Sequence, residues 1–199
     1  MHDYNLTKLD SKIVDDDDDD SRDSDVTTVG NKIYFYSDVG RNNLNLNKSI
    51  VELNNKLLQY QTSLGVDNLK IELNINSYGG ALFDGLASVD YIRNSRIPIT
   101  TVINGCAASA ATLMSVVGAE RKMYKHSYML IHQLSTGMWG KYSELKDEVE
   151  SCDSMMKTIK EIYAEYTKIP KRQLNSLLSR DVWWDSDKCL EYGLIDEII

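Results

Sequence analysis

The sequence is poor in the residues that build disulfide frameworks and metal sites, and it has no long hydrophobic run. Its three cysteines, Cys106, Cys152 and Cys189, are an odd number at wide spacings and form no CxxC pair. This pattern predicts neither a disulfide framework nor a zinc site and is typical of a reducing compartment. No apolar run approaches the ~20 residues that span a bilayer, and the first twelve residues lack the apolar core of a secretory signal. We therefore predict a cytoplasmic protein with no metal, no cofactor and no membrane contact.

Basic charge is also scarce. The 199 residues carry a formal net charge of −8, and residues 15–25, DDDDDDSRDSD, account for −7 of it. The nearly neutral remainder offers no basic surface for nucleic acid. Adjacent like charges repel one another and bury no apolar surface. We interpret residues 1–28 as a flexible acidic N-terminal arm and residues 29–199 as one folded domain; a divalent-ion or partner-binding role for the acidic run is the alternative.

The remaining sequence alternates between strand and helix patterns. Predicted strands cover residues 32–39, 69–75, 97–103, 121–125 and 128–133, and predicted helices cover 46–60, 81–95, 107–119 and 141–167, with a short helix after Pro170. This alternation predicts an α/β fold with right-handed parallel crossovers. Glycine turns at 79–80 and at 105 are expected at strand ends before helices, where open α/β sheets collect their binding sites.

Ser109 is the first residue of chemical interest, within INGCAASAAT at residues 103–112. Small residues at such a junction usually indicate close packing, which is the structural interpretation. If Ser109 lies in the first turn of its helix, the free backbone N–H groups there can stabilise an oxyanion. The N–H of Ala110 would be one donor, and the N–H of Gly80 in the NSYGG turn the second. Cys106 is interpreted as a small buried hydrophobe rather than a thiol nucleophile.

A base and an acid are available, each with a structural alternative. His2 falls in the arm and His126 in a predicted turn, whereas His132 ends an apolar strand, where it either faces a cleft or serves the structure. Asp181 lies in apolar surroundings beside two tryptophans and either orients the histidine or pairs with Arg180. No pair of carboxylates of the glycosidase type stands out. The residues alone leave these alternatives open.

Four segments resemble the ClpP family, the proteolytic subunit of the Clp protease. They are NINSYGGALFDGLASVDYI, GCAASAATLMSVVGAERKMY, YMLIHQ and SRDVWWDSDKCLEYGLIDEII, in the order that the family has them. The similarity runs from about residue 32 to the C-terminus. It implies the ClpP/crotonase-like spiral of β-α-β units with a long handle helix, the handle being the strand and helix at about residues 134–167.

The resemblance also implies the roles of the site residues. Ser109 matches the nucleophile, His132 the general base and Asp181 the acid that orients the histidine. The backbone N–H groups of Gly80 and Ala110 match the oxyanion hole. Substrate is expected to lie extended beside the two segments that flank the site, at Ala81 and at Leu134 and Ser135.

The implied function is a serine endopeptidase acting on unfolded polypeptide or peptides inside a homo-oligomeric chamber. In the family the chamber consists of heptameric rings paired face to face, and a AAA+ Clp ATPase is a possible partner. Two other functions stay open at this point. One is a catalytically silent ClpP-like ring subunit or scaffold, and the other is a crotonase-type acyl-CoA enzyme.

The sequence departs from the family at five places, one of them the stretch between Ser109 and His132, which is about two residues shorter than in the family. Tyr78 replaces the usual proline of the glycine turn, and Leu134 to Thr136 replace a proline and glycines after the histidine. Ser179 replaces an acidic residue that helps link the rings, so a ring contact that is weaker or differently made is expected. The polyaspartate arm replaces a partly apolar axial loop, which leaves docking of an ATPase open. Removal of residues 1–25 is expected to leave the fold intact.

Overall fold

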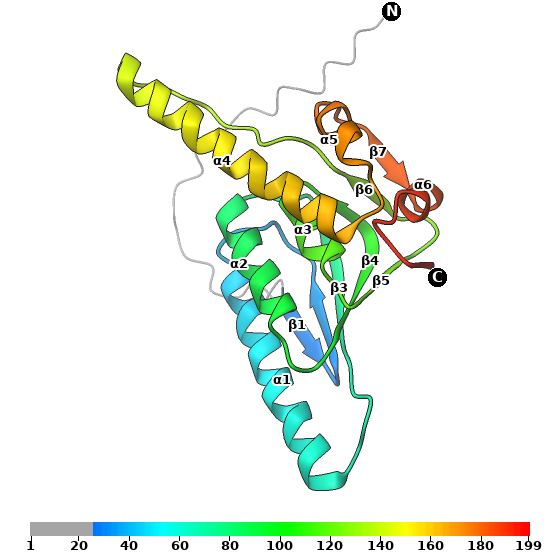
Figure 1. Cartoon of the computed structure of the whole chain (residues 1–199). Coiled ribbons are helices and arrows are strands. Elements are labelled where there is room, and N and C mark those ends of the chain that lie inside the picture. Colours follow the sequence, from blue (N-terminus) through cyan, green and yellow to red (C-terminus); the bar gives the residue numbers. More distant parts are fainter. Residues whose placement is uncertain (1–25) are drawn as a thin grey trace, which may run out of the picture.

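The computed structural model describes residues 26–199 and has the predicted α/β fold, with one sheet and helices (Figure 1). The strands are β1 (Val26–Val29), β2 (Lys32–Phe35), β3 (Ile71–Ser77), β4 (Ile99–Ala108), β5 (Glu120–Met123), β6 (Tyr128–Leu130), β7 (Trp183–Asp185) and β8 (Glu197–Ile198). The helices are α1 (Asn43–Leu64), α2 (Leu82–Arg93), α3 (Ala110–Val116), α4 (Tyr142–Tyr166), α5 (Lys171–Leu178) and α6 (Ser186–Glu191).

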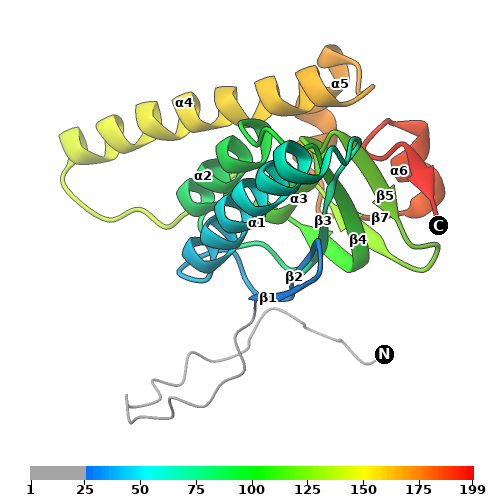
Figure 2. The ribbon, with the colours of Figure 1, turned by 90° about the horizontal axis from the view of Figure 1, so that it is seen from below.

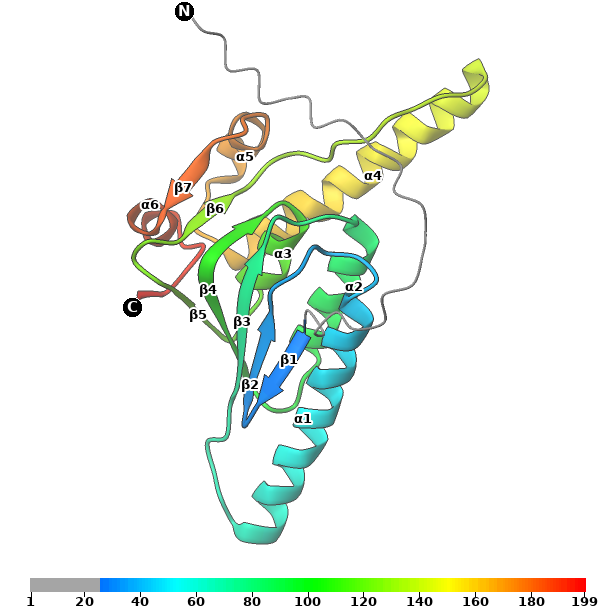
Figure 3. The same ribbon diagram turned by 180° about the vertical axis from the view of Figure 1, so that it is seen from behind.

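The sheet has the strand order β1-β2-β3-β4-β5-β8, with β6 and β7 branching from β4. The pairs from β2 to β8 along this path are parallel, and only β1 pairs antiparallel with its neighbour on it. Helices α1, α2 and α3 cover one face, whereas the view from behind shows the strands with these helices beyond them (Figures 2 and 3). The parallel order confirms the predicted crossovers, since each needs a helix on the face of the sheet.

The core lies between this covered face and the helices. β3 is buried through Ile71, Leu73 and Ile75, the face that strict alternation predicts. α1 contributes Leu46 and Ile50 at helical spacing, and both are buried. Each such side chain stabilises the fold by about 1.5–3 kcal/mol when it leaves water. The core therefore fixes the ends of β3 and β4, the two strands that lead to the site.

The region around Gly105 differs from the prediction. β4 continues to Ala108, so the expected turn at Gly105 and the expected helix start at residue 107 are wrong. Gly105 has φ +101°, and a Cβ there would lie 2.7 Å from Oδ1 of Asn76, so glycine lets the strand kink and continue. Residues 106–108 stay extended because they pair with β6. The small residues serve a strand, and the helix begins only at Ala110.

Two other boundaries also differ. Residues 26–29 form β1 and pair with β2, so the folded part includes residues that were assigned to the arm; residues 1–25 of that arm lie outside the described residues. β6 ends at Leu130, and residues 131–139 have no regular secondary structure, so the expected handle strand is absent there. That segment runs out along α4, which extends well beyond the body of the molecule (Figures 1 and 3). The long helix itself is confirmed to within one residue.

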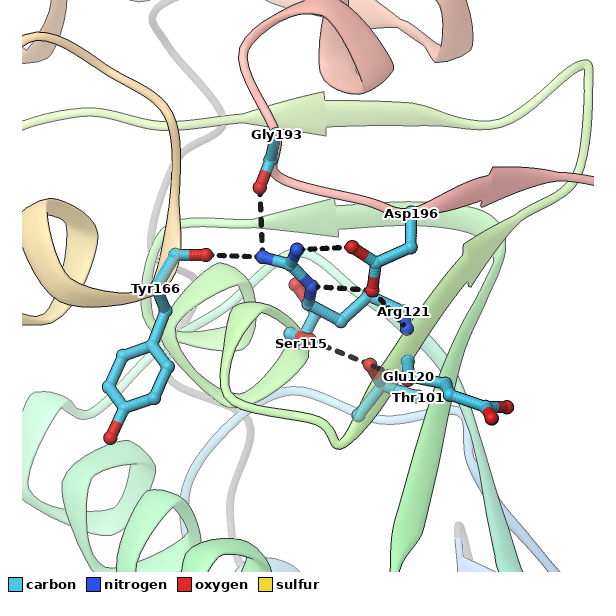
Figure 4. Close-up of polar contacts among 7 residues, drawn as sticks. All are labelled: Thr101, Ser115, Glu120, Arg121, Tyr166, Gly193 and Asp196. Carbon is cyan, nitrogen blue, oxygen red and sulfur yellow. Dashed lines mark hydrogen bonds and ion pairs between the residues drawn. The ribbon is translucent and has the colours of Figure 1, made fainter.

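The C-terminal segment is tied to the body by Arg121 in β5 (Figure 4). Its guanidinium donates to Oδ2 of Asp196 at 2.9 Å and to the carbonyl oxygens of Gly193, at 2.8 Å, and Tyr166. The hydrogen bonds from Arg121 hold the pKa of Asp196 below its usual value. One side chain thus joins β5, the last residue of α4 and the C-terminal strand region. Within residues 26–199, no helix combines the length and apolar character needed to cross a membrane.

Candidate active site

Ser109 occupies a strained junction between β4 and α3. Its φ of +52° and ψ of −126° place a non-glycine residue in a sparsely populated region, at a cost of about 1–3 kcal/mol. Its N–H donates to the carbonyl of Leu130 at 2.9 Å, and its carbonyl accepts from N and Oγ1 of Thr112 at 3.0 and 2.5 Å. The residue is therefore the N-cap of α3 rather than part of its first turn. Hydrogen bonds on both sides hold the strained conformation.

The SYGG turn lies directly against this junction. Gly79 has φ +92°, and a Cβ there would lie 2.6 Å from the carbonyl oxygen of Ala108 and from Cβ of Ser109. Two hydrogen bonds with Val39 hold the turn. The N–H of Val39 donates to the carbonyl of Gly79 at 2.7 Å, and the N–H of Ala81 donates to the carbonyl of Val39 at 2.8 Å. Only glycine permits this approach. Among residues 26–199, neither the Gly80 N–H nor the Ala110 N–H has a protein acceptor.

His132 and Asp181 are brought together by a connection between β6 and α5. His132 lies two residues after the end of β6, and the N–H of Gln133 donates to the carbonyl of Leu178 at 2.7 Å. This bond places Nδ1 of His132 3.7 Å from Oδ1 of Asp181. The distance suits an ion pair but exceeds that of a hydrogen bond. The Asp181 side chain is 79% exposed, against 20% for His132, so the acid is held loosely.

One pocket of about 430 Å³ collects most of the predicted site residues. Its lining residues are Tyr78, Gly80, Ala81, Leu82, Ser109, Ala110, Leu113, His132, Gln133, Leu134, Ser135, Ile159 and Tyr163. Of the predicted site residues only Asp181 does not line it. The pocket thus contains a hydroxyl, an imidazole and two free N–H groups, the set that acyl transfer requires. A larger groove of about 750 Å³ between α4 and α5 contains none of the predicted residues.

Residues of α3 and α4 complete the pocket, and the sequence did not single them out. Ile159 and Tyr163 come from α4, and Thr112 lies behind the wall of the pocket. Tyr163 is 50 or more residues from both Ser109 and Gly80, so no local spacing links them. The apolar periodicity of α4 was the only available signal, and it indicated a packed face rather than a site.

The cysteines stay outside the pocket. Cys106 is half-buried rather than buried as predicted, with Sγ 3.7 Å from the carbonyl of Ser77. Burial raises the pKa of its thiol, which disfavours the nucleophilic thiolate. Within residues 26–199, no three His, Cys, Asp or Glu side chains are grouped so as to hold a metal ion.

The fold and site together define an α/β protein with a strained serine in a pocket that also holds a histidine, and the comparisons place it in a family. Residues 45–199 match the model of the Clp protease family, and the chain belongs to that family. It is 30% identical over 132 residues to an ATP-dependent Clp protease proteolytic subunit of Deinococcus radiodurans, covering 65% of each chain. It is 33% identical over 129 residues to the ATP-dependent Clp protease proteolytic subunit 1 of Chlamydia caviae, covering 63% of this chain and 68% of that protein.

A solved structure agrees with the fold. The chain superimposes on a mutant of ClpP1 from Listeria monocytogenes with a TM-score of 0.73 and 22% identity, covering 85% of this chain and 91% of the other. The chain matches 65% of the length of the Deinococcus relative, just under two thirds. The family and the fold are thereby established, and the roles of Ser109, His132, Asp181, Gly80 and Ala110 remain predictions.

Proposed function

We propose that the protein is a serine endopeptidase, the proteolytic subunit of a Clp-type protease. The observation that carries this proposal is the pocket that joins Ser109, His132 and the free N–H groups of Gly80 and Ala110. Membership of the Clp protease family supports it, because the Deinococcus and Chlamydia relatives are named as proteolytic subunits.

The chemistry follows from the roles of these groups. His132 takes the proton of the Ser109 hydroxyl while Oγ of Ser109 attacks a peptide carbonyl carbon, and a tetrahedral intermediate forms. His132 then gives that proton to the leaving amine, the C–N bond breaks, and water hydrolyses the acyl-enzyme by the same route. Asp181 orients the imidazole through Nδ1 and stabilises its charged form. The N–H groups of Gly80 and Ala110 bind the oxyanion, each contributing about 3 kcal/mol.

We expect the substrate to bind as an added strand. Ala81 and Leu134 both line the pocket, and residues 131–139 form no strand pairing of their own. Main-chain hydrogen bonds to these flanks provide affinity with little side-chain specificity. The N–H of Leu134 contacts Sδ of Met156 at 3.1 Å, a weak acceptor that a substrate carbonyl can replace.

Assembly is part of the proposal. α4 extends beyond the body of the molecule (Figure 2). Tyr142, its first residue, and Trp139, just before it, are both strongly exposed. Exposed aromatic side chains on a projecting element are typical of a surface that a partner covers. We propose a homo-oligomer of heptameric rings that encloses the sites, with a AAA+ Clp ATPase as the partner that delivers unfolded polypeptide.

The test combines activity, labelling and mass. The full-length protein is incubated with a fluorogenic peptide and with a fluorophosphonate probe, and its mass is measured by light scattering. Cleavage, labelling of Ser109 and a multimeric mass are expected, and Ser109→Ala is expected to abolish the first two while leaving the mass unchanged. Absence of cleavage in the assembled protein, or labelling at another residue, contradicts the proposal and favours a catalytically silent ring subunit.

A further inference from the structure

The peptide that links Ser109 to Ala110 has a carbonyl that is hydrogen-bonded and an N–H group that is free. The carbonyl of Ser109 and the N–H of Ala110 belong to the same trans peptide, so they point in opposite directions. Thr112 binds the carbonyl through two donors, its N–H at 3.0 Å and its Oγ1 at 2.5 Å. Both lone pairs of that carbonyl are thereby used. The N–H of Ala110 must then point away from α3, toward the pocket that Ala110 lines.

Tyr163 supports the Thr112 hydroxyl from the opposite side. The two hydroxyl oxygens are 2.5 Å apart. A threonine hydroxyl has a single proton, and in Thr112 it is donated to the Ser109 carbonyl, so the tyrosine hydroxyl must be the donor between the two. Such a chain of hydroxyls strengthens each bond in it. Tyr163 is 1% exposed, and burial raises the pKa of its hydroxyl, so it remains a donor at neutral pH.

Both residues are anchored to the body of the protein. The Oγ of Ser115 donates to the carbonyl of Thr112 at 2.9 Å, and Thr101 donates from β4 to the carbonyl of Ser115 at 2.7 Å (Figure 4). Arg121 binds the carbonyl of Tyr166, one turn after Tyr163 in α4 (Figure 4). The sheet therefore fixes both ends of the Thr112–Tyr163 contact.

We propose that Thr112 and Tyr163 are positioning residues that aim the Ala110 N–H at the oxyanion, by holding the other end of its peptide plane. The inference rests on the proposed peptidase function. Ser109 is strained, and rotation of the following peptide would relieve that strain while turning the N–H away from the pocket. The hydroxyl pair opposes this rotation. Neither side chain touches the reacting atoms; both act through the backbone.

Loss of either hydroxyl is expected to weaken stabilisation of the transition state without weakening substrate binding. An oxyanion forms only after attack, so a misdirected N–H lowers kcat and leaves KM nearly unchanged. Complete loss of one donor costs about 100- to 1,000-fold in kcat. Because the Thr112 N–H still holds the carbonyl, we expect a smaller fall, of roughly 10-fold, in Tyr163→Phe and in Thr112→Val.

The experiment uses the full-length assembled protein. Its variants are Tyr163→Phe, Thr112→Val and Thr112→Ser, with Tyr166→Phe as the matched control on the same helix. The readouts are kcat and KM on a fluorogenic peptide, and inhibition by a peptide boronic acid, whose tetrahedral adduct with serine places an oxygen in the oxyanion hole. Melting temperature and mass are measured for each variant, so a loss of folding is recognised. Thr112→Ser retains the hydroxyl that Thr112→Val removes. Comparison of these two variants therefore tests the proposal even if Tyr163→Phe does not fold.

Support requires that Tyr163→Phe and Thr112→Val lower kcat and weaken boronic acid inhibition by similar factors, with KM within about twofold. Thr112→Ser and Tyr166→Phe must behave as the unmodified protein does. Equal effects in Tyr163→Phe and Tyr166→Phe, or a loss confined to KM or to melting temperature, overturn the positioning role alone. Absence of Ser109-dependent cleavage in the unmodified protein overturns the proposed function itself, and the inference with it.

Discussion

The two halves of the candidate site are built very differently. Ser109 is held through both of its peptide groups, by hydrogen bonds to Leu130 of β6 and to Thr112 of α3. Asp181 is 79% exposed and approaches His132 only to 3.7 Å. The fold of one chain therefore sets the predicted nucleophile and the predicted oxyanion donors. His132 and Asp181, the predicted base and acid, lie near the surface, where the chain alone does not complete their contact.

This difference has a physical origin. A strained backbone persists only where the surrounding structure over-determines it, and buried hydrogen bonds do so because breaking them leaves polar groups without partners. An exposed carboxylate exchanges its partner for water at little cost. We infer that substrate or neighbouring subunits tighten the His132–Asp181 contact, since apo contacts of this kind often close only in the reactive complex.

The largest effect is expected from Ser109→Ala. Removal of the hydroxyl of the predicted nucleophile is expected to lower kcat/KM for peptide cleavage by about 10⁴-fold or more. Cys106→Ala is the control, since the Cys106 thiol lies nearby but does not line the pocket. Its activity is expected to stay within about threefold of the unmodified protein. A collapse of activity in Cys106→Ala with survival in Ser109→Ala would reverse the assignment.

Gly79→Ala tests how tightly the nucleophile half is packed. The added Cβ would lie 2.6 Å from backbone and from Cβ of Ser109, at a φ of +92°, so the turn must move. We expect a fall in kcat of about 100-fold and a loss of roughly 1–3 kcal/mol in the free energy of unfolding. Gly137→Ala is the matched control, because a Cβ there meets nothing within 4 Å and its φ is not positive. Equal results for the two variants, by kinetics and thermal melting, would contradict the close approach.

Asp181→Asn tests how much the exposed Asp181 carboxylate contributes to the His132–Asp181 half of the site. We expect a fall in kcat of about 100-fold, at the low end of the range for acid–base groups, because the carboxylate is exposed. Asp187→Asn, an exposed aspartate that pairs with Lys125, is the control. A fall as large as that of Ser109→Ala would show that the assembled protein holds its acid as firmly as its nucleophile, and the contrast between the halves would vanish.

The smallest effect concerns stability. Arg121 lowers the pKa of Asp196 below 3.8, so the folded protein binds this proton less tightly than the unfolded chain. The resulting stabilisation is present above the unfolded pKa and is lost as the pH falls through the lower folded pKa. Because the Asp196 side chain is half exposed, the contribution is at most about 1 kcal/mol. Melting curves of Asp196→Asn and the unmodified protein should differ at pH 7 and converge toward pH 3; a gap that widens in acid would contradict this sign.

Much of the fold was predictable because it depends on local patterns. Alternation predicted the buried face of β3, and helical periodicity predicted α4 to within one residue. The end of β4 was not predictable in this way, since residues 106–108 look like the start of a helix and stay extended only because β6 pairs with them. Small side chains permit either conformation, and the neighbouring strand decides between them.

The sequence by itself determined the chemistry available to this protein: one serine at a glycine-rich junction, one histidine after an apolar strand and no thiol or metal cluster of comparable promise. Its resemblance to ClpP indicated which residues belong together. Only the tertiary structure decided that Tyr163 of α4, 51 residues after Thr112 in the chain, contacts Thr112 behind Ser109. It also decided that Asp181 stays exposed. Contacts of this kind depend on how helices pack across the sheet, and no local pattern records that packing.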